Sequence, residues 1–216
     1  MKVLAVGAHP DDVELGCGAT LALFKQKGHE VYILVLTKGE ASGNPQIRVN
    51  ECKISAKVLG AKKIFFGDLK DTRITDGIET IMEIEKVINL VKPDFVFSHS
   101  PKDVHQDHRN TALAILSAAR NSKKVLLYES PAALKDFLPQ VFVDVESTFS
   151  VKLEALKSFG SQASKIFFKG NNHHYDESRK FPVVSNAVEG LARYRGFQAG
   201  VGLAEAFEAG KFLLEI

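Results

Sequence analysis

The sequence predicts an α/β fold, a single Rossmann-like domain in which helices cover both faces of a mostly parallel sheet. Three observations predict it. Short apolar runs rich in β-branched and aromatic residues alternate with longer stretches in which apolar residues recur at helical spacing. Glycine or proline stands where several of these helices should end. Strands that alternate with helices are typical of parallel sheets, because each helix carries the chain back across the sheet.

Five short apolar runs predict buried strands in the first part of the chain: residues 2–7, 31–36, 63–66, 95–98 and 125–128. Four stretches between them predict helices: residues 15–27, 46–59, 78–91 and 107–119. Gly28 and Gly60 follow the first two helices, where a C-cap favours glycine. Asp76 is a candidate cap at the start of the third helix, and Pro93 prevents that helix from continuing beyond Val91.

The pattern after residue 128 is less regular. We expect a strand over residues 140–145, helices over about 148–159 and 185–197, and a terminal strand over 212–216. The segment 160–184 is polar and predicted to be irregular. Because no repeat or shift in composition marks a boundary, one domain is predicted over residues 1–216, a length that allows a sizeable core.

The composition predicts a soluble globular protein, with 45% apolar and 25% charged residues. The formal charge is only +2, and no basic stripe of the kind that binds nucleic acid is present. We expect a cytoplasmic protein, because neither a signal peptide nor an apolar run of roughly 20 residues that could span a membrane is found. Cys17 and Cys52 are too few to form a zinc ribbon and are expected to be reduced, structural thiols.

Two clusters of histidine and carboxylate side chains follow predicted strands. His9 and Asp12 come directly after the first strand, and His105 and His108 follow the fourth. Because the carboxyl ends of parallel strands meet at one edge of a sheet, we expect both clusters to lie there. The members of each pair are three residues apart, so one turn can direct both toward a single ion. Nitrogen and carboxylate donors with an open position for water favour catalytic zinc, and the same donors also suit iron.

Other interpretations of the first cluster remain open at this point. Asp11 or Asp12 can cap the helix that follows without binding any ion. A dinucleotide site is disfavoured, because the turn from Gly7 to Asp12 lacks the G-x-G-x-x-G spacing and its two carboxylates would repel a phosphate.

The motifs resemble those of a known family. The run AHPDDVELGCGAT at 8–20, paired with HQDH at 105–108, is similar to the PIG-L/LmbE-like family of zinc-dependent N-acetylglucosaminyl deacetylases. Weaker matches extend the resemblance over nearly the whole chain: LTKGE at 36–40, Arg48 with Glu51, Gly60, Arg195-Gly196, and GLAEAF at 202–207.

The resemblance implies a division of labour in the site. His9, Asp12 and His108 would hold the zinc, and Asp11 would be the general base that takes a proton from the attacking water. His105 would stabilise the tetrahedral oxyanion and protonate the leaving amine.

Further residues have weaker assignments. Asp107 is expected to orient His105, to cap its helix, or both. Arg48 is the candidate substrate contact, with a surface salt bridge to Glu51 as the alternative. Glu40 lies at the pocket rim or is solvated, and His99 at most supports the site from outside. Core or loop roles are favoured over substrate contacts for Tyr194, Arg195 and Glu205. A solvated loop is favoured over a lid contact for His173 and His174.

The sequence departs from the family pattern at two places. Ala19 replaces the second glycine of a Gly-Gly pair, which has little chemical consequence. A tyrosine that helps to stabilise the oxyanion in some members is missing, because the region ahead of the second motif is PKDV at 101–104. His105 or another group would then carry more of the charge of the transition state.

The function implied by the resemblance is removal of the N-acetyl group from an N-acetylglucosamine-type sugar or conjugate, with release of acetate. The cofactor would be Zn²⁺, with Fe²⁺ or Co²⁺ as alternatives, the partner a small-molecule substrate, and the assembly a homo-oligomer. Two alternatives are another metal-dependent hydrolase, acting on a different amide or a phosphoester, and a non-catalytic sugar- or nucleotide-binding module. A structural zinc in such a module should have four protein ligands.

Overall fold

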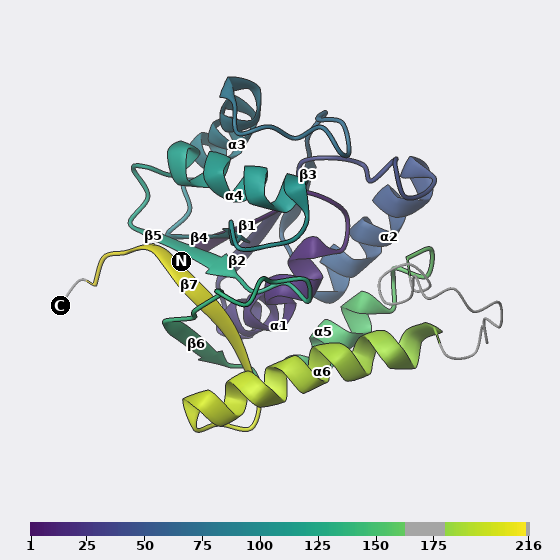
Figure 1. Cartoon of the computed structure of the whole chain (residues 1–216), viewed down its shortest axis with the longest axis vertical. Helices are drawn as coiled ribbons and strands as arrows, with labels where there is room; N and C mark the ends of the chain where they lie inside the picture. The colour runs from purple at the N-terminus through teal and green to yellow at the C-terminus, as the bar shows by residue number, and fades with distance from the viewer. Residues whose placement is uncertain (163–179, 215–216) are drawn as a thin grey trace.

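The computed structural model of the chain describes residues 1–162 and 180–214. Within these residues seven strands form one sheet in the order β3-β2-β1-β4-β5-β7-β6 (Figure 1). Neighbouring strands from β3 to β5 are parallel, whereas β7 runs antiparallel to both β5 and β6. The strands are β1 Lys2–Gly7, β2 Glu30–Val35, β3 Lys63–Phe66, β4 Phe95–His99, β5 Lys124–Tyr128, β6 Val141–Asp144 and β7 Ala204–Phe212. The predicted mostly parallel sheet is therefore confirmed.

Helices cover both faces of this sheet, as predicted (Figure 1). The helices within the described residues are α1 Asp12–Gln26, α2 Pro45–Val58, α3 Ile78–Val91, α4 Gln106–Ala118, α5 Phe149–Leu156 and α6 Lys180–Ala199. Alternate residues of β1 face opposite ways. Val3 packs with the core under α1, α2 and α5, and Leu4 packs with the core under α3 and α4. A strand that is buried on both faces does not alternate between polar and apolar residues, so its sequence is a continuous apolar run.

The predicted terminal strand over residues 212–216 is wrong in position, because β7 ends at Phe212. The first five residues of β7 are buried, and two of them are glutamates. Glu205 pairs with Lys152, and Glu208 pairs with Lys102. These charged side chains broke the apolar pattern and concealed the strand. The predicted helix over 185–197 lies inside α6, and residues 163–179 of the predicted irregular segment lie outside the described residues.

Helix α1 is broken at Cys17, whose φ of −143° and ψ of 20° are not helical. The break separates a short first turn, which begins at Asp12, from the longer remainder of the helix. Gly16 allows this turn to lie against the buried ring of Tyr128, because a Cβ on Gly16 would come 2.1 Å from the Tyr128 Cδ2 atom. The Tyr128 hydroxyl in turn donates to the Val6 carbonyl at 2.9 Å, which ties the contact to β1.

We expect Gly16→Ala to lower the free energy of unfolding by about 1–3 kcal/mol, the usual cost of overpacking a core. Neither the buried Tyr128 ring nor the sheet behind it has room to move. Gly190→Ala in α6 is the matched control, because a Cβ there meets nothing within 4 Å. Urea denaturation of both variants checks the prediction, and equal stabilities would contradict it.

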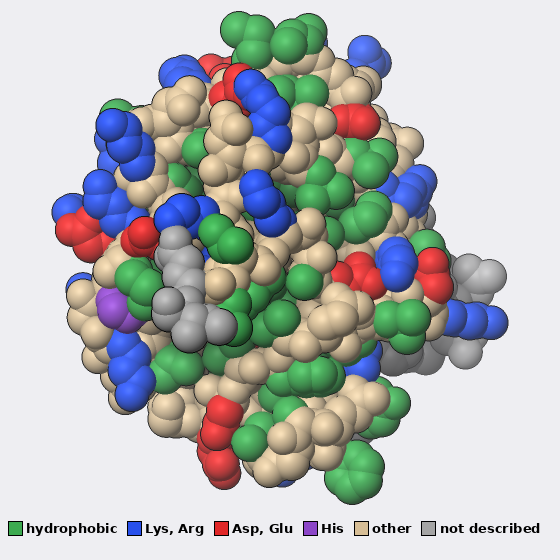
Figure 2. All heavy atoms as spheres, turned by 90° about the vertical axis from the view of Figure 1, so that its left-hand side faces the viewer, with side chains coloured by type: hydrophobic (Ala, Val, Ile, Leu, Met, Phe, Trp, Pro, Cys, Tyr) green, Lys and Arg blue, Asp and Glu red, His purple; other side chains and the backbone are tan. Residues whose placement is uncertain are grey.

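Two observations bear on binding to membranes and to nucleic acid. No helix in the described part of the chain combines the length and apolarity needed to cross a bilayer. On the face drawn in Figure 2, basic and acidic side chains are interspersed with apolar ones. That face carries no continuous basic stripe.

Candidate metal centre

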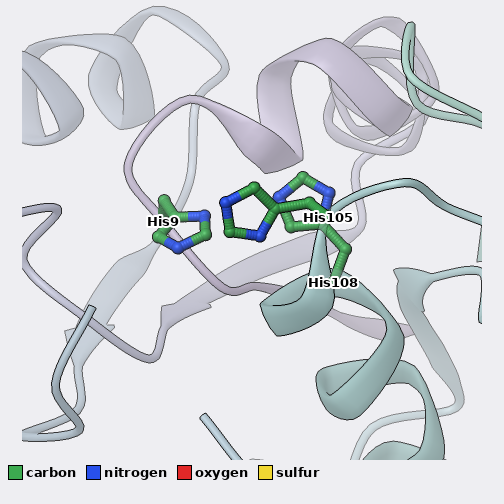
Figure 3. Close-up of side chains that lie close together, drawn as sticks. All are labelled: His9, His105 and His108. Carbon is green, nitrogen blue, oxygen red and sulfur yellow. The ribbon is translucent and has the colours of Figure 1, made fainter. Parts of the chain in front are cut away.

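Two loops meet at the carboxyl ends of β1 and β4, which are neighbours in the sheet. The loop after β1 carries His9 into the start of α1, and the loop after β4 carries His105 into the start of α4. His108 lies one turn into α4. Figure 3 shows the three imidazoles converging from these elements. The ring centroid of His105 lies 4.9 Å from that of His9 and 4.6 Å from that of His108, so both clusters form one site.

Asp12 lies between the two histidines that are predicted to bind the metal with it. His9 Nδ1 lies 3.3 Å from Asp12 Oδ2, and His108 Nε2 lies 3.3 Å from Asp12 Oδ1. Donors about 2.1 Å from a tetrahedral ion are separated by roughly 3.4 Å, the edge of that tetrahedron. Each contact is close to this edge, although the two contacts use different oxygens of Asp12. The donor types fit a divalent metal ion, and His9, Asp12 and His108 stay the predicted ligands.

More donor groups surround this point than one ion can use. Among the described residues, three sets of side chains place ligand atoms within 4.8 Å of one another, and the predicted set of His9, Asp12 and His108 is not one of them. The three sets are His9, His105 and His108; Asp12, His99 and His108; and His9, Asp71 and Asp107. The hydrogen bonds of each side chain decide which atoms are free to face an ion.

His9 is held from behind by two buried carboxylates. Its Nε2 lies 3.1 Å from Asp71 Oδ1 and 3.2 Å from Asp107 Oδ2. A carboxylate on the far nitrogen of a ligand histidine keeps the proton there and directs the other nitrogen to the metal. Burial alone would lower the pKa of His9, but Asp12, Asp107 and Asp71 raise it well above its ordinary value. Asp71 and Asp107 are thus placed to support the predicted ligand role of His9 Nδ1.

A strained loop brings Asp71 to this position. Thr72 has a φ of 67°, an uncommon conformation for a β-branched residue, and donates its backbone N–H to Asp107 Oδ2 at 2.7 Å. Glu40 accepts the backbone N–H of Asp71 at 3.0 Å, so Glu40 holds this loop from an exposed position. Backbone strain of this kind costs about 1–3 kcal/mol and clusters at functional sites.

His108 has a similar support. Its Nδ1 lies 3.0 Å from Asp103 Oδ2, which leaves Nε2 directed toward Asp12. Asp103 also accepts the Ser130 hydroxyl and the backbone N–H of His105. Burial would lower the pKa of His108, yet Asp12 and Asp103 raise it to about 9. Because a ligand histidine must be neutral, metal binding here would release a proton.

Asp11, the predicted base, is buried in a left-handed conformation with a φ of 104°. Burial raises the pKa of Asp11 to about 7, although Arg48 opposes this shift. Arg48 donates to the Pro10 carbonyl at 2.6 Å and to Asp11 Oδ2 at 3.3 Å. Its other terminal nitrogen donates to the Gly39 carbonyl at 3.1 Å. The guanidinium thus fixes the backbone and side chain of the strained turn.

This geometry corrects one expectation about Arg48. The alternative of a surface salt bridge with Glu51 is wrong, because Arg48 is only 3% exposed and Glu51 instead accepts from the backbone N–H and hydroxyl of Ser161. A substrate contact by Arg48 stays a prediction, since each hydrogen bond described for its guanidinium goes to the protein.

His105 is a half-buried cap of α4. Its Nδ1 accepts the backbone N–H of Asp107 at 3.2 Å, so its Nε2 carries the proton in the neutral ring. Burial, together with His108 and His9, lowers the pKa of His105. The predicted orientation of His105 by Asp107 is therefore provided by the backbone of Asp107, whose carboxylate contacts His9 instead.

Residues 4–119, more than half of the chain, match the family described as PIG-L, GlcNAc-PI de-N-acetylase. The chain belongs to this family. The resemblance inferred from the two histidine motifs is confirmed, since both motifs lie inside the matched residues.

Individual relatives agree with membership in the PIG-L family. The uncharacterized deacetylase YaiS of Escherichia coli is 38% identical over 169 residues, which cover 74% of this chain and 90% of YaiS. Diacetylchitobiose deacetylase of Thermococcus kodakarensis is 31% identical over 186 residues, which cover 74% of this chain and 70% of that enzyme. The conserved protein TT1542 of Thermus thermophilus superposes with a TM-score of 0.83 at 25% identity, covering 99% of this chain and 96% of TT1542.

The weaker candidates from the C-terminal part of the family pattern have partners away from the metal donors. Arg195 bonds to Glu129 with two nitrogens, Glu205 pairs with Lys152, and Tyr194 is 56% exposed. Arg195 and Glu205 are buried, as expected for core roles, whereas Tyr194 is exposed on helix α6 and lies neither in the core nor in a loop. His173 and His174 lie outside the described residues.

Sequence reasoning missed the carboxylates that support the two ligand histidines. Asp103 carried a weak signal, because it lies two residues before His105 in the same predicted loop. Asp71 carried none, since its contact with His9 depends on how the loop after β3 packs across the sheet edge.

Proposed function

We propose that this PIG-L family member is a zinc-dependent N-deacetylase that removes the acetyl group from an N-acetylglucosamine-type sugar or sugar conjugate. The observation that carries the proposal is the position of Asp12, whose two oxygens lie 3.3 Å from His9 Nδ1 and from His108 Nε2, next to the buried carboxylate of Asp11. The names of the related deacetylases support the same reaction.

The donor set supports zinc as the ion, with Fe²⁺ and Co²⁺ as alternatives, because two imidazoles and one carboxylate leave a position open for a reactant. Such an ion supplies a Lewis acid that polarises the amide carbonyl and lowers the pKa of a water to roughly 7. The protein supplies the remaining groups.

Asp11 accepts the proton of the attacking water. Burial makes its carboxylate a stronger base than an exposed aspartate, and Arg48 keeps it in place. His105 directs Nε2–H into the site and donates to the oxyanion that develops on the amide oxygen. The Nδ1 hydrogen bond to the Asp107 backbone fixes the ring for this task. The leaving amine takes the proton that Asp11 accepted, because the neutral ring of His105 cannot give up its Nε2 proton without becoming an imidazolate. The predicted protonation of the amine therefore passes from His105 to Asp11.

Acetate release from a panel of N-acetylated substrates tests the function, with zinc removed by a chelator and then restored. The panel contains the free sugar, chito-oligosaccharides, and N-acetylglucosaminyl conjugates with polar and lipid aglycones. We expect acetate and a free amine from at least one of them, loss of activity without metal, and recovery with Zn²⁺.

Two results would contradict the proposal. A metal-replete protein that hydrolyses only other amides or phosphoesters would be a different hydrolase. A fully coordinated ion with four protein ligands, and no acetate release, would indicate the non-catalytic module. The expected homo-oligomer is checked separately by sedimentation.

A further inference from the structure

His99, at the end of β4, lies beneath the metal centre and has no assigned role. It is only 1% exposed, and its Nε2 lies 3.1 Å from Asp12 Oδ2. Its ring stacks on His108 with centroids 4.0 Å apart and an interplanar angle of 16°. On the other side it packs against Tyr128 at 4.9 Å. His99 therefore contacts two of the three metal ligands while it is closed off from solvent.

The surroundings of His99 indicate which nitrogen carries its proton. Nδ1 is buried and has no hydrogen-bond partner among the described residues. The backbone N–H of Ala8 donates to Nε2 at 3.2 Å, and Asp12 Oδ2 lies 3.1 Å from the same nitrogen.

Only one of these two neighbours can be satisfied, because Nε2 either donates or accepts. If the proton were on Nδ1, a buried N–H would lack a partner and the Nε2 lone pair would face a carboxylate. If the proton is on Nε2, a charge-assisted hydrogen bond to Asp12 forms, the Ala8 N–H loses its acceptor, and Nδ1 is left as an unpartnered acceptor. Charge-assisted bonds are roughly twice as strong as neutral ones, so the second arrangement is favoured.

The consequence concerns the orientation of Asp12. Its Oδ2 accepts the backbone N–H of His9 at 2.7 Å and lies within reach of His99 Nε2, whereas its Oδ1 faces His108 Nε2. We propose that His99 is a positioning residue which donates Nε2–H to Asp12 Oδ2 and thereby turns Oδ1 toward the metal ion. His99 is not itself a ligand, since its Nε2 is already engaged. This inference rests on the proposed metal site and does not depend on the substrate.

Metal affinity, measured without substrate, tests the inference. His99→Phe keeps a ring between His108 and Tyr128 and removes the donor. We expect its zinc dissociation constant, from competition with a chelator at fixed pH, to rise about 10–100-fold, as for other groups that orient metal ligands. Thermal melting of the metal-free protein should not fall, because the variant also removes a buried unpartnered nitrogen. Ser98→Ala is the control, since Ser98 is the buried neighbour whose hydroxyl has no partner among the described residues.

The visible spectrum of the Co²⁺ form separates a positioning residue from a ligand. We expect His99→Phe to keep the band pattern of the wild-type protein. Zinc affinity equal to that of the wild type, or a spectrum showing one fewer nitrogen ligand, would overturn the inference.

Two polar variants keep the test decisive if His99→Phe does not fold. The amide of His99→Gln can reach Asp12 and donate to it, whereas the shorter side chain of His99→Asn cannot. If His99→Gln binds zinc more tightly than His99→Asn, the inference is supported. Equal zinc affinities of these two variants would overturn it. A wild-type protein that binds zinc but releases no acetate contradicts only the proposed function.

Discussion

Asp11→Asn should lower kcat for deacetylation by about 10²–10⁴-fold, the usual contribution of a general base, while the bound metal stays near the wild-type amount. The amide has the shape of the carboxylate but cannot accept a proton. Asparagine also tolerates the left-handed backbone that Asp11 adopts, so the substitution adds no strain to the turn. Steady-state kinetics, together with elemental analysis of the same preparation, measure both quantities.

Asp12→Asn is the matched control for this prediction. It makes the same chemical change at the next residue, where the carboxylate lies between His9 and His108. We expect this variant to lose the metal and the activity together. If Asp11→Asn also lost its metal, Asp11 would be a ligand, and the division between base and ligand in this turn would be refuted.

The sequence was sufficient for the parts of the site that local patterns determine. His9 and Asp12 follow a strand that is buried on both faces, and His105 and His108 open a helix, so the edge of the sheet and the spacing of the donors could both be inferred. The start of the first helix was predicted too late, because α1 begins at Asp12 and the expected start was Leu15.

The rest depends on contacts between distant segments, which spacing does not encode. Asp71 reaches His9 only because Thr72 adopts a strained backbone and Glu40 holds the loop. Arg48 was expected at the surface or on the substrate, yet it is buried beneath the strained turn. Buried charges mislead pattern-based prediction in the same way, since β7 contains glutamates at buried positions and was placed too late in the chain.

Replacement of one of these buried glutamates should lower the stability of the protein substantially. Glu205→Leu is expected to lower the free energy of unfolding by about 3–5 kcal/mol, because it leaves a buried charge without its partner. Lys152 Nζ lies 2.6 Å from Glu205 Oε1, and the two side chains are only 4% and 3% exposed. Urea denaturation of the metal-free protein measures the change.

The break in α1 explains why this pair is not easily replaced. Glu205 accepts the backbone N–H groups of Ala19 and Thr20, at 3.1 and 2.7 Å, just beyond the break at Cys17. Lys152 donates to the Leu15 carbonyl on the other side of the break at 2.8 Å. The pair therefore joins the two parts of α1 and fixes the short turn that begins at Asp12.

A double-mutant cycle with Lys152→Met separates the ion pair from the rest of this effect. Because Lys152→Met/Glu205→Leu leaves no unpaired charge, its loss of stability should be smaller than the sum of the two single losses. Arg193→Met is the control, since the Arg193–Glu189 pair on α6 is 65% and 37% exposed and should contribute less than about 1 kcal/mol. Additive losses would show that Glu205 acts only through the backbone N–H groups of α1. The break would then be held without help from the charge of Lys152.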